Sequence, residues 1–113
     1  MTTEQAARRD VPAGTLEMLI LQTISAGPMH GYGIAQQIER VSDGVLCAEQ
    51  GSLYPALERL LLKGWAKAEW GDTPTRRKAR YYTITEAGRR HLVTRLSDYD
   101  RVSHAIARVL LRA

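Results

Sequence analysis

The first half of the chain carries apolar residues at helical spacing. The pattern predicts a helix over residues 14–26, ended by Gly27-Pro28, with apolar positions Leu16, Met18, Leu19, Ile20, Leu21 and Ile24. A second helix is predicted after residues 29–33, with Ile34, Ile38 and Val41 as its buried edge and an end at 42–44. A third is predicted over residues 50–63 and closed by Gly64 at a C′ position. Three short helices therefore open the chain.

The second half switches to strand spacing and then returns to a helix. Residues 65–70 alternate at period two, 71–75 have turn chemistry, and 79–84 are rich in β-branched and aromatic residues. Thr85 is expected to cap a last helix that runs towards the C-terminus, with Glu86 in its first turn. The order predicts a mainly α fold with a small β-hairpin, a winged helix-turn-helix followed by an extra helix. The predicted divisions are a flexible N-terminal tail at 1–12, the winged helix-turn-helix at 13–84 and the last helix at 85–113.

The third helix has two different faces. With Leu57 pointing inward, Leu53, Leu60 and Leu61 fall on the same side and Tyr54 at its edge, while the opposite side carries Ser52, Pro55, Arg59 and Lys63. Pro55 lies near the helix start, where amides lack intrahelical partners. Small polar residues at the front, Gln50, Gly51 and Ser52, suit a helix that enters the DNA major groove. Taken alone, the segment also fits an ordinary amphipathic helix.

Positive charge is concentrated in one part of the chain. The net charge is +4, and residues 65–91 alone contribute +4, against −2 for residues 1–64 and +2 for residues 92–113. The hairpin return holds the best candidates for phosphate contacts, Arg76, Arg77, Lys78 and Arg80. A solvated basic face is the plainer alternative. Tyr32 is expected at the edge of the core, with its hydroxyl as a further phosphate contact. Trp65, Trp70, Tyr81 and Tyr82 are expected mostly to pack rather than to form a platform for single strands.

Several functional classes find no support in the residues. Cys47 is the single cysteine, so the chain has no disulfide within itself, which fits the cytoplasm; a redox switch at Cys47 stays a minor alternative. His30, His91 and His104 lack metal-ligand spacing. No nucleophile with a nearby base, no phosphate-cradling loop and no membrane-length apolar run stands out. We therefore expect no enzyme activity, no cofactor, no metal and no membrane partner.

Four segments together resemble the PadR family of bacterial transcriptional regulators. They are GTLEMLILQTIS (14–25), MHGYGIAQQIE (29–39), GSLYPALERLLLKGWAKAEW (51–70) and RKARYYTITEAGRRHL (77–92). The resemblance covers residues 12–112. It implies a dimeric winged-helix DNA-binding protein, usually a repressor, with its recognition helix at 50–63 and its wing at 65–84. It also implies that the C-terminal helix packs on the N-terminal helix of the partner subunit, and hence that Leu16, Leu19 and Ile20 belong to the dimer interface.

The last helix itself indicates a dimer. Leu92, Leu96, Tyr99, Ser103, Ile106 and Leu110 follow heptad spacing with one polar break, and Val102 and Val109 thicken the seam. The alternative is a helix that packs only on the first helix of its own chain.

The chain looks like the short branch of the family, which includes a lactococcal multidrug-resistance regulator. That protein binds flat aromatic drugs at its dimer interface and stacks them on a tryptophan, whose position Tyr99 takes here. The resemblance therefore implies a small aromatic or phenolic effector at Tyr99.

These observations predict a ligand-responsive, homodimeric repressor that binds specific double-stranded DNA in a bacterial cytoplasm. The alternative is a winged-helix dimer that binds a protein or a small molecule without specific DNA readout.

Overall fold

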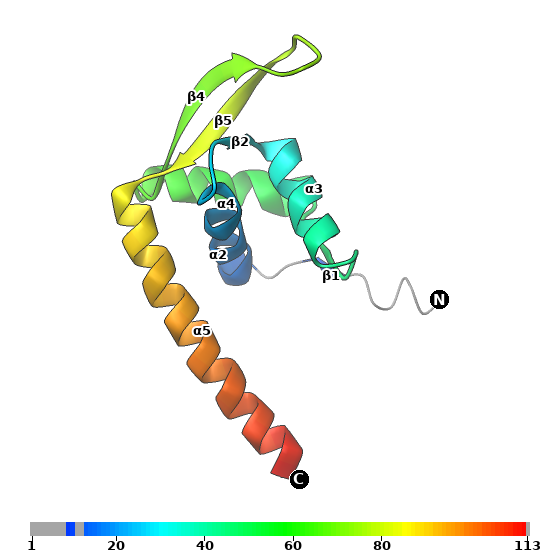
Figure 1. The fold of residues 1–113 in the computed structure, drawn as a ribbon, viewed down its shortest axis with the longest axis vertical. Coiled ribbons are helices and arrows are strands. Elements are labelled where there is room, and N and C mark those ends of the chain that lie inside the picture. Colours follow the sequence, from blue (N-terminus) through cyan, green and yellow to red (C-terminus); the bar gives the residue numbers. More distant parts are fainter. Residues whose placement is uncertain (1–8, 11–12, 113) are drawn as a thin grey trace.

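The computed structural model describes residues 9–10 and 13–112, and its main body is three helices and a hairpin (Figure 1). The elements are β1 (Arg9–Asp10), α2 (Ala13–Ile24), β2 (Met29–His30), α3 (Gly31–Val41), β3 (Leu46–Cys47), α4 (Gln50–Leu62), β4 (Ala66–Asp72), β5 (Lys78–Ile84) and α5 (Glu86–Arg112). This order confirms the mainly α fold with a small β-hairpin and one additional long helix.

The hairpin belongs to a slightly larger sheet than the sequence predicts. β4 and β5 pair antiparallel from Ala66↔Ile84 to Asp72↔Lys78, and β2 pairs with the other edge of β5. The result is a three-stranded sheet in the order β2-β5-β4. Since β2 is two residues long, it shows no alternation by which the sequence could reveal it. The third strand nevertheless fixes the start of α3 against the hairpin.

A second short pairing involves the predicted tail. Arg9–Asp10 pair in parallel with Leu46–Cys47, within the segment predicted as a loop. The remainder of the predicted tail, residues 1–8 and 11–12, lies outside the described residues. Among the described residues, the chain before α2 is therefore joined to the segment that leads into α4.

The core forms where the apolar faces of α2, α3 and α4 meet one face of the hairpin. Its fully buried large side chains are Leu16, Ile20, Leu21, Ile24, Ile34, Leu53, Leu57 and Leu60. This confirms the predicted inner faces of α2 and α4. It also corrects the placement of Leu16 and Ile20 at the dimer interface, because both are 0% exposed within their own chain. Leu92 of α5 belongs to the same core and is likewise shielded.

The predicted burial of Val41 is wrong. It is 66% exposed, although Ile34 and Ile38 on the same helix are buried. α3 ends at Val41, and the chain then reverses through Asp43 and Gly44, both at positive φ. The last turn of α3 therefore lies beyond the core, although Val41 shares a helix face with the buried Ile34 and Ile38.

A network of hydrogen bonds joins the base of the hairpin to α5. Gly64 ends α4 at positive φ, with the Trp65 amide donating to the Leu60 carbonyl (3.0 Å), as predicted for a C′ glycine. The Thr85 hydroxyl accepts from the Gly88 amide (3.0 Å) and donates to the Gly64 carbonyl (2.7 Å). The predicted Thr85 cap is thus confirmed, and it also fixes where α5 leaves the body.

α5 packs closely against that base and then projects away. A methyl group added at Gly88 would lie 2.0 Å from the Trp65 carbonyl oxygen, so only glycine permits this approach. Beyond Leu92 the helix leaves the core, and Figure 1 shows its C-terminal half extending free of the other elements. The projecting part carries large exposed apolar side chains, namely Leu96, Tyr99, Val102, Ile106, Val109, Leu110 and Leu111.

Candidate nucleic-acid interface

The exposed side of α4 is a row of five residues that we call the outward stripe: Gly51, Tyr54, Pro55, Glu58 and Leu62. They recur at steps of three and four, so they share one side of the helix, opposite buried Leu53, Leu57 and Leu60. Nothing lies within 4 Å of the position that a Gly51 Cβ would take. The front of α4 is therefore open to a large partner.

Pro55 lies deeper in α4 than the sequence analysis predicts. α4 begins at Gln50, so Pro55 is its sixth residue and lies beyond the first turn. An amide there would normally donate to the carbonyl of Gly51, four residues earlier, and proline has no such hydrogen. The prediction that Pro55 lies where amides lack intrahelical partners is thus wrong. The Gly51 carbonyl therefore lacks the amide donor that it would otherwise have four residues later in the helix.

Tyr32 and Tyr54 flank this front. Tyr54 packs over buried Gly31, where an added Cβ would lie 3.1 Å from the ring. Tyr32 follows at the start of α3 and is largely exposed. The His30 Nδ1 caps the same helix by accepting from the Gly33 amide at 3.0 Å, a role the sequence analysis did not assign. The start of α3 thereby places the Tyr32 ring in the same groove as Tyr54, which belongs to the outward stripe.

The hairpin provides the opposite wall of a groove. The groove has a volume of about 330 Å³ and is lined by His30, Gly31, Tyr32, Tyr54, Glu58, Trp70, Lys78, Ala79, Arg80 and Tyr82. Burial raises the pKa of the Tyr82 hydroxyl, and Glu58 and Tyr54 raise it further, while Arg80 lowers it. Tyr82 therefore stays neutral at physiological pH. The groove brings the start of α3, the outward stripe of α4 and the hairpin together.

Six groove residues were not assigned to the site by the sequence analysis, namely His30, Gly31, Glu58, Trp70, Ala79 and Tyr82, and of these Trp70 and Glu58 have exposed side chains with reach. Trp70 pairs with Arg80 across the hairpin and lies on the same sheet face as buried Tyr82, yet it is 70% exposed. The sheet at that point extends beyond the core. The prediction that the aromatic rings of the hairpin mostly pack against the core is therefore wrong for Trp70. Glu58 was recognisable from its spacing of seven residues after Gly51.

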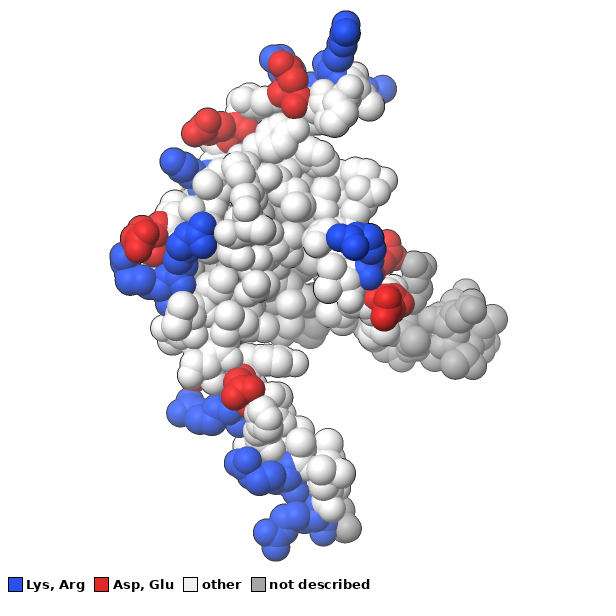
Figure 2. Space-filling model, viewed as in Figure 1, with Lys and Arg blue, Asp and Glu red and all other residues white. Residues whose placement is uncertain are grey.

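The predicted basic residues of the hairpin are placed at or near its tip. Figure 2 shows Lys and Arg side chains gathered there, beyond a largely uncharged middle of this face. Arg76 sits in the turn at φ 65°, and its amide donates to the Thr73 carbonyl at 2.8 Å. Arg77 is exposed, and Lys78 pairs with Asp72 at 2.9 Å. These cations project away from the body and are accessible to a polyanion.

Three other predicted cations have partners within the chain. Arg80 Nη1 donates to Glu58 Oε1 at 3.1 Å, within the groove. Arg59 Nε donates to Glu17 Oε1 at 3.0 Å, on the side of α4 that faces α2. Lys63 Nζ lies 4.8 Å from the centre of the Trp65 ring. Arg59 and Lys63 are thus separate from the groove. Of the predicted residues of α4, Tyr54 lines the groove, while Gln50, Gly51 and Pro55 are exposed on the same helix outside its lining.

Within 9–10 and 13–112, no three His, Cys, Asp or Glu side chains cluster in a way that could hold a metal ion. None of the helices in that part of the chain has the length and apolarity needed to cross a membrane. Cys47 is a partly buried free thiol within β3, where it pairs with Asp10 of β1.

Comparison with known proteins agrees with this geometry. Residues 20–94 match the family described as "Transcriptional regulator PadR-like family". A protein of Lysinibacillus sphaericus is 29% identical over 88% of this chain and 91% of its own length. A 37.1 kDa transposon protein of Streptomyces fradiae is 37% identical over 82% of this chain, which matches only 23% of that protein.

Solved structures share the fold. A PadR-like transcriptional regulator of Bacillus cereus superposes with a TM-score of 0.73 at 26% identity, covering 86% of this chain and 92% of the other. Bacillus subtilis PadR in complex with operator DNA has a TM-score of 0.65 at 24% identity, covering 73% and 47%. With the match over residues 20–94, these findings show that the chain belongs to the PadR-like family of transcriptional regulators and is not an enzyme.

Proposed function

We propose that this transcriptional regulator binds specific double-stranded DNA as a homodimer, with the front of α4 in the major groove and the hairpin tip on the adjacent backbone. The observation that carries the proposal is the groove, because it places an open helix front, two exposed tyrosines and the basic hairpin on one side. The related fold of Bacillus subtilis PadR has been solved with operator DNA. A regulator that acts on the chromosome also belongs in the bacterial cytoplasm.

Within this proposal the residues have different roles. Gln50, Gly51, Ser52, Tyr54 and Pro55 approach base edges, since recognition helices contact bases with their N-terminal residues. Tyr32, Arg76, Arg77 and Lys78 hold phosphates. Arg80, Arg59 and Lys63 have partners within the chain and lie away from the hairpin tip, so their contribution to phosphate binding is smaller. Lys78 pairs with Asp72 but keeps its role, because its side chain is 72% exposed.

The dimer half of the proposal rests on α5. Its projecting part exposes Leu96, Tyr99, Ile106 and Leu110 along one seam, and Val102 beside it. A continuous apolar stripe of that length normally marks an interface. Leu19 is partly buried at the edge of the core and stays a candidate contact for the partner. Two subunits would then present two copies of α4 to half-sites about one helical turn apart.

A small aromatic or phenolic effector would act at the same interface. Tyr99 is half-exposed on the seam of α5, so its ring would face the partner subunit or a ligand between the two. An effector that changed the angle between subunits would change the half-site spacing and release DNA.

A salt titration with duplex DNA tests the proposal. Affinity is expected to fall steeply with salt concentration, and Arg77→Ala to flatten the logarithmic slope by about one unit. Arg80→Ala is expected to flatten it by less than about one unit, because Glu58 already pairs with Arg80. Weak binding of every duplex at low salt would contradict DNA recognition and favour a dimer that binds protein or small molecules instead.

A further inference from the structure

Glu58 is the charged member of the outward stripe, and its position is unusual for a phosphate-facing surface. It follows Tyr54 by four residues and Gly51 by seven, so the three share one side of α4. Its side chain is 57% exposed. Gly51 and Pro55 on the same stripe have no hydrogen-bonding side chain. Glu58 is thus the stripe's carboxylate, aimed at the space that the proposed function assigns to DNA.

Arg80 holds this carboxylate from the neighbouring strand. Its Nη1 donates to Glu58 Oε1 at 3.1 Å, and the arginine side chain is only 37% exposed. β5, which carries Arg80, is paired on both edges, by β2 and β4, and is therefore a rigid base. An exposed ion pair of this kind adds little to the stability of the fold. Its clearer effect is to orient the carboxylate.

The chemistry of a carboxylate restricts which base it can face. It accepts hydrogen bonds through two oxygens, and the single bond to Arg80 leaves further acceptor capacity. In the major groove, guanine presents the acceptors N7 and O6, thymine presents O4, and adenine presents N7 beside its amino group. Cytosine presents the N4 amino donor without an adjacent acceptor. Cytosine is therefore the base that a carboxylate prefers.

We infer that Glu58 selects cytosine at one base pair of each half-site by accepting a hydrogen bond from its N4 amino group, with Arg80 as the positioning residue. The inference rests on the proposed function, in which α4 enters the major groove. Glu58 also weakens non-specific binding, since it places a negative charge close to the phosphates. Arg80 thereby contributes to sequence readout more than to phosphate contact.

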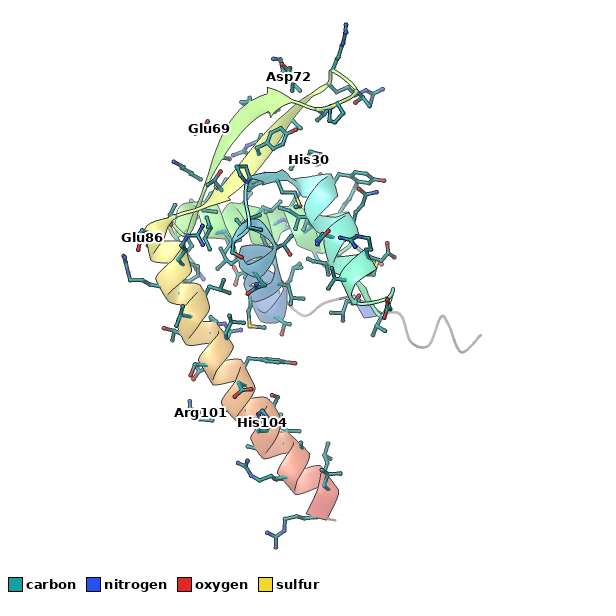
Figure 3. All side chains as sticks on the ribbon, in the orientation of Figure 1. His30, Glu69, Asp72, Glu86, Arg101 and His104 are labelled. Carbon is teal, nitrogen blue, oxygen red and sulfur yellow. The ribbon has the colours of Figure 1, made fainter. Side chains whose placement is uncertain are left out.

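The test compares base preferences of matched variants. An operator is selected from randomised duplexes with the wild-type chain, and all four bases are then tested at each half-site position. The variants are Glu58→Ala, Glu58→Gln and the control Glu69→Ala. Glu69 is also an exposed carboxylate, but it pairs with Tyr81 on the sheet face opposite to Arg80 and Tyr82, and Figure 3 shows it beside β4.

The wild-type chain is expected to prefer cytosine at one position by about 5- to 150-fold over the other bases. Glu58→Ala is expected to lose that preference and to bind random duplex more tightly. Glu58→Gln is expected to shift it towards adenine, because an amide pairs with adenine N6 and N7. Glu69→Ala is expected to leave the preference unchanged. A shifted preference cannot arise from a variant that fails to fold.

Two outcomes separate this inference from the proposed function. If Glu58→Ala and Glu58→Gln retain the wild-type base preferences while binding the operator, Glu58 does not read a base, although DNA recognition stands. If the wild-type chain prefers no sequence at all, the proposed function itself fails and the inference falls with it.

Discussion

Gly51 is a residue at which nothing in the fold requires glycine. Its φ is not in the left-handed region, and nothing lies within 4 Å of where a Cβ would be. Gly88 is the opposite case, since its Cβ would lie 2.0 Å from a backbone oxygen. Packing within the chain therefore explains Gly88, whereas Gly51 is left open for the close approach to DNA that we propose.

For Gly51→Ala we expect unchanged or slightly higher stability, by up to about 1 kcal/mol, because alanine favours helix over glycine. We also expect weaker operator binding, because the methyl group stands between the helix front and the base edges. Thermal unfolding and a binding titration measure the two effects. Operator affinity equal to that of the wild type would show that this end of α4 does not approach DNA closely.

Arg76 has an unfavourable backbone conformation, although its positive charge suits the phosphate contact that we propose. At φ 65° it occupies the left-handed region, which costs a non-glycine residue about 1–2 kcal/mol. Arg76→Gly is expected to be more stable than Arg77→Gly by about 1 kcal/mol, since both lose one charge and only the first relieves the backbone. Chemical denaturation of the two variants measures this difference. Equal stabilities would contradict the strained turn.

At the scale of elements, the base of the hairpin and the start of α5 form one unit. The Trp65 carbonyl accepts from the Thr85 amide at 3.0 Å, and the Trp65 ring stacks on His91 with 3.5 Å between ring centres. Burial lowers the pKa of His91, and the positive charges of Arg95 and Lys63 lower it further, against a smaller opposite effect of Glu17. The protonated form of His91 is thus disfavoured in the folded state.

This predicts that stability falls in acid. Because the folded pKa of His91 lies below its ordinary value of 6.5, the unfolded chain binds more protons, and stability is lost as the pH falls below about 6.5. His91→Phe keeps a stacked ring without the titration. The difference in unfolding free energy between His91→Phe and the wild type is expected to be constant above pH 7 and to grow in favour of the variant towards pH 5.5. A difference that does not change with pH would argue against this coupling.

At the scale of the whole molecule, α5 decides the shape. The protomer measures 54 × 37 × 21 Å, and its long axis follows the projecting helix (Figure 1). Figure 2 shows basic side chains along one edge of that helix. Beyond Leu92 the opposite edge is apolar and uncovered by the protomer's own body. A second copy of the chain would remove that surface from water.

Ile106→Lys is expected to convert the dimer to a monomer, because the interface would have to bury an unpaired charge. Arg101→Glu, which changes charge on the far side of the same helix, is expected to remain dimeric. Light scattering after size exclusion measures both. A wild-type protein that is monomeric at micromolar concentration would contradict the dimer, and dimeric Ile106→Lys would place the interface elsewhere.

Local spacing was enough to predict the order of the main elements, the inner faces of α2 and α4, the hairpin, and the caps at Gly64 and Thr85. Helix and strand periods determine on which side of its own element a residue lies, because they depend only on backbone geometry. The tertiary structure alone decided what each side meets. It made Leu16 and Ile20 core residues, left Val41 and Trp70 exposed beyond the core, and paired Arg80 with Glu58. Those outcomes depend on where elements end and cross, which is set by contacts between residues far apart in sequence.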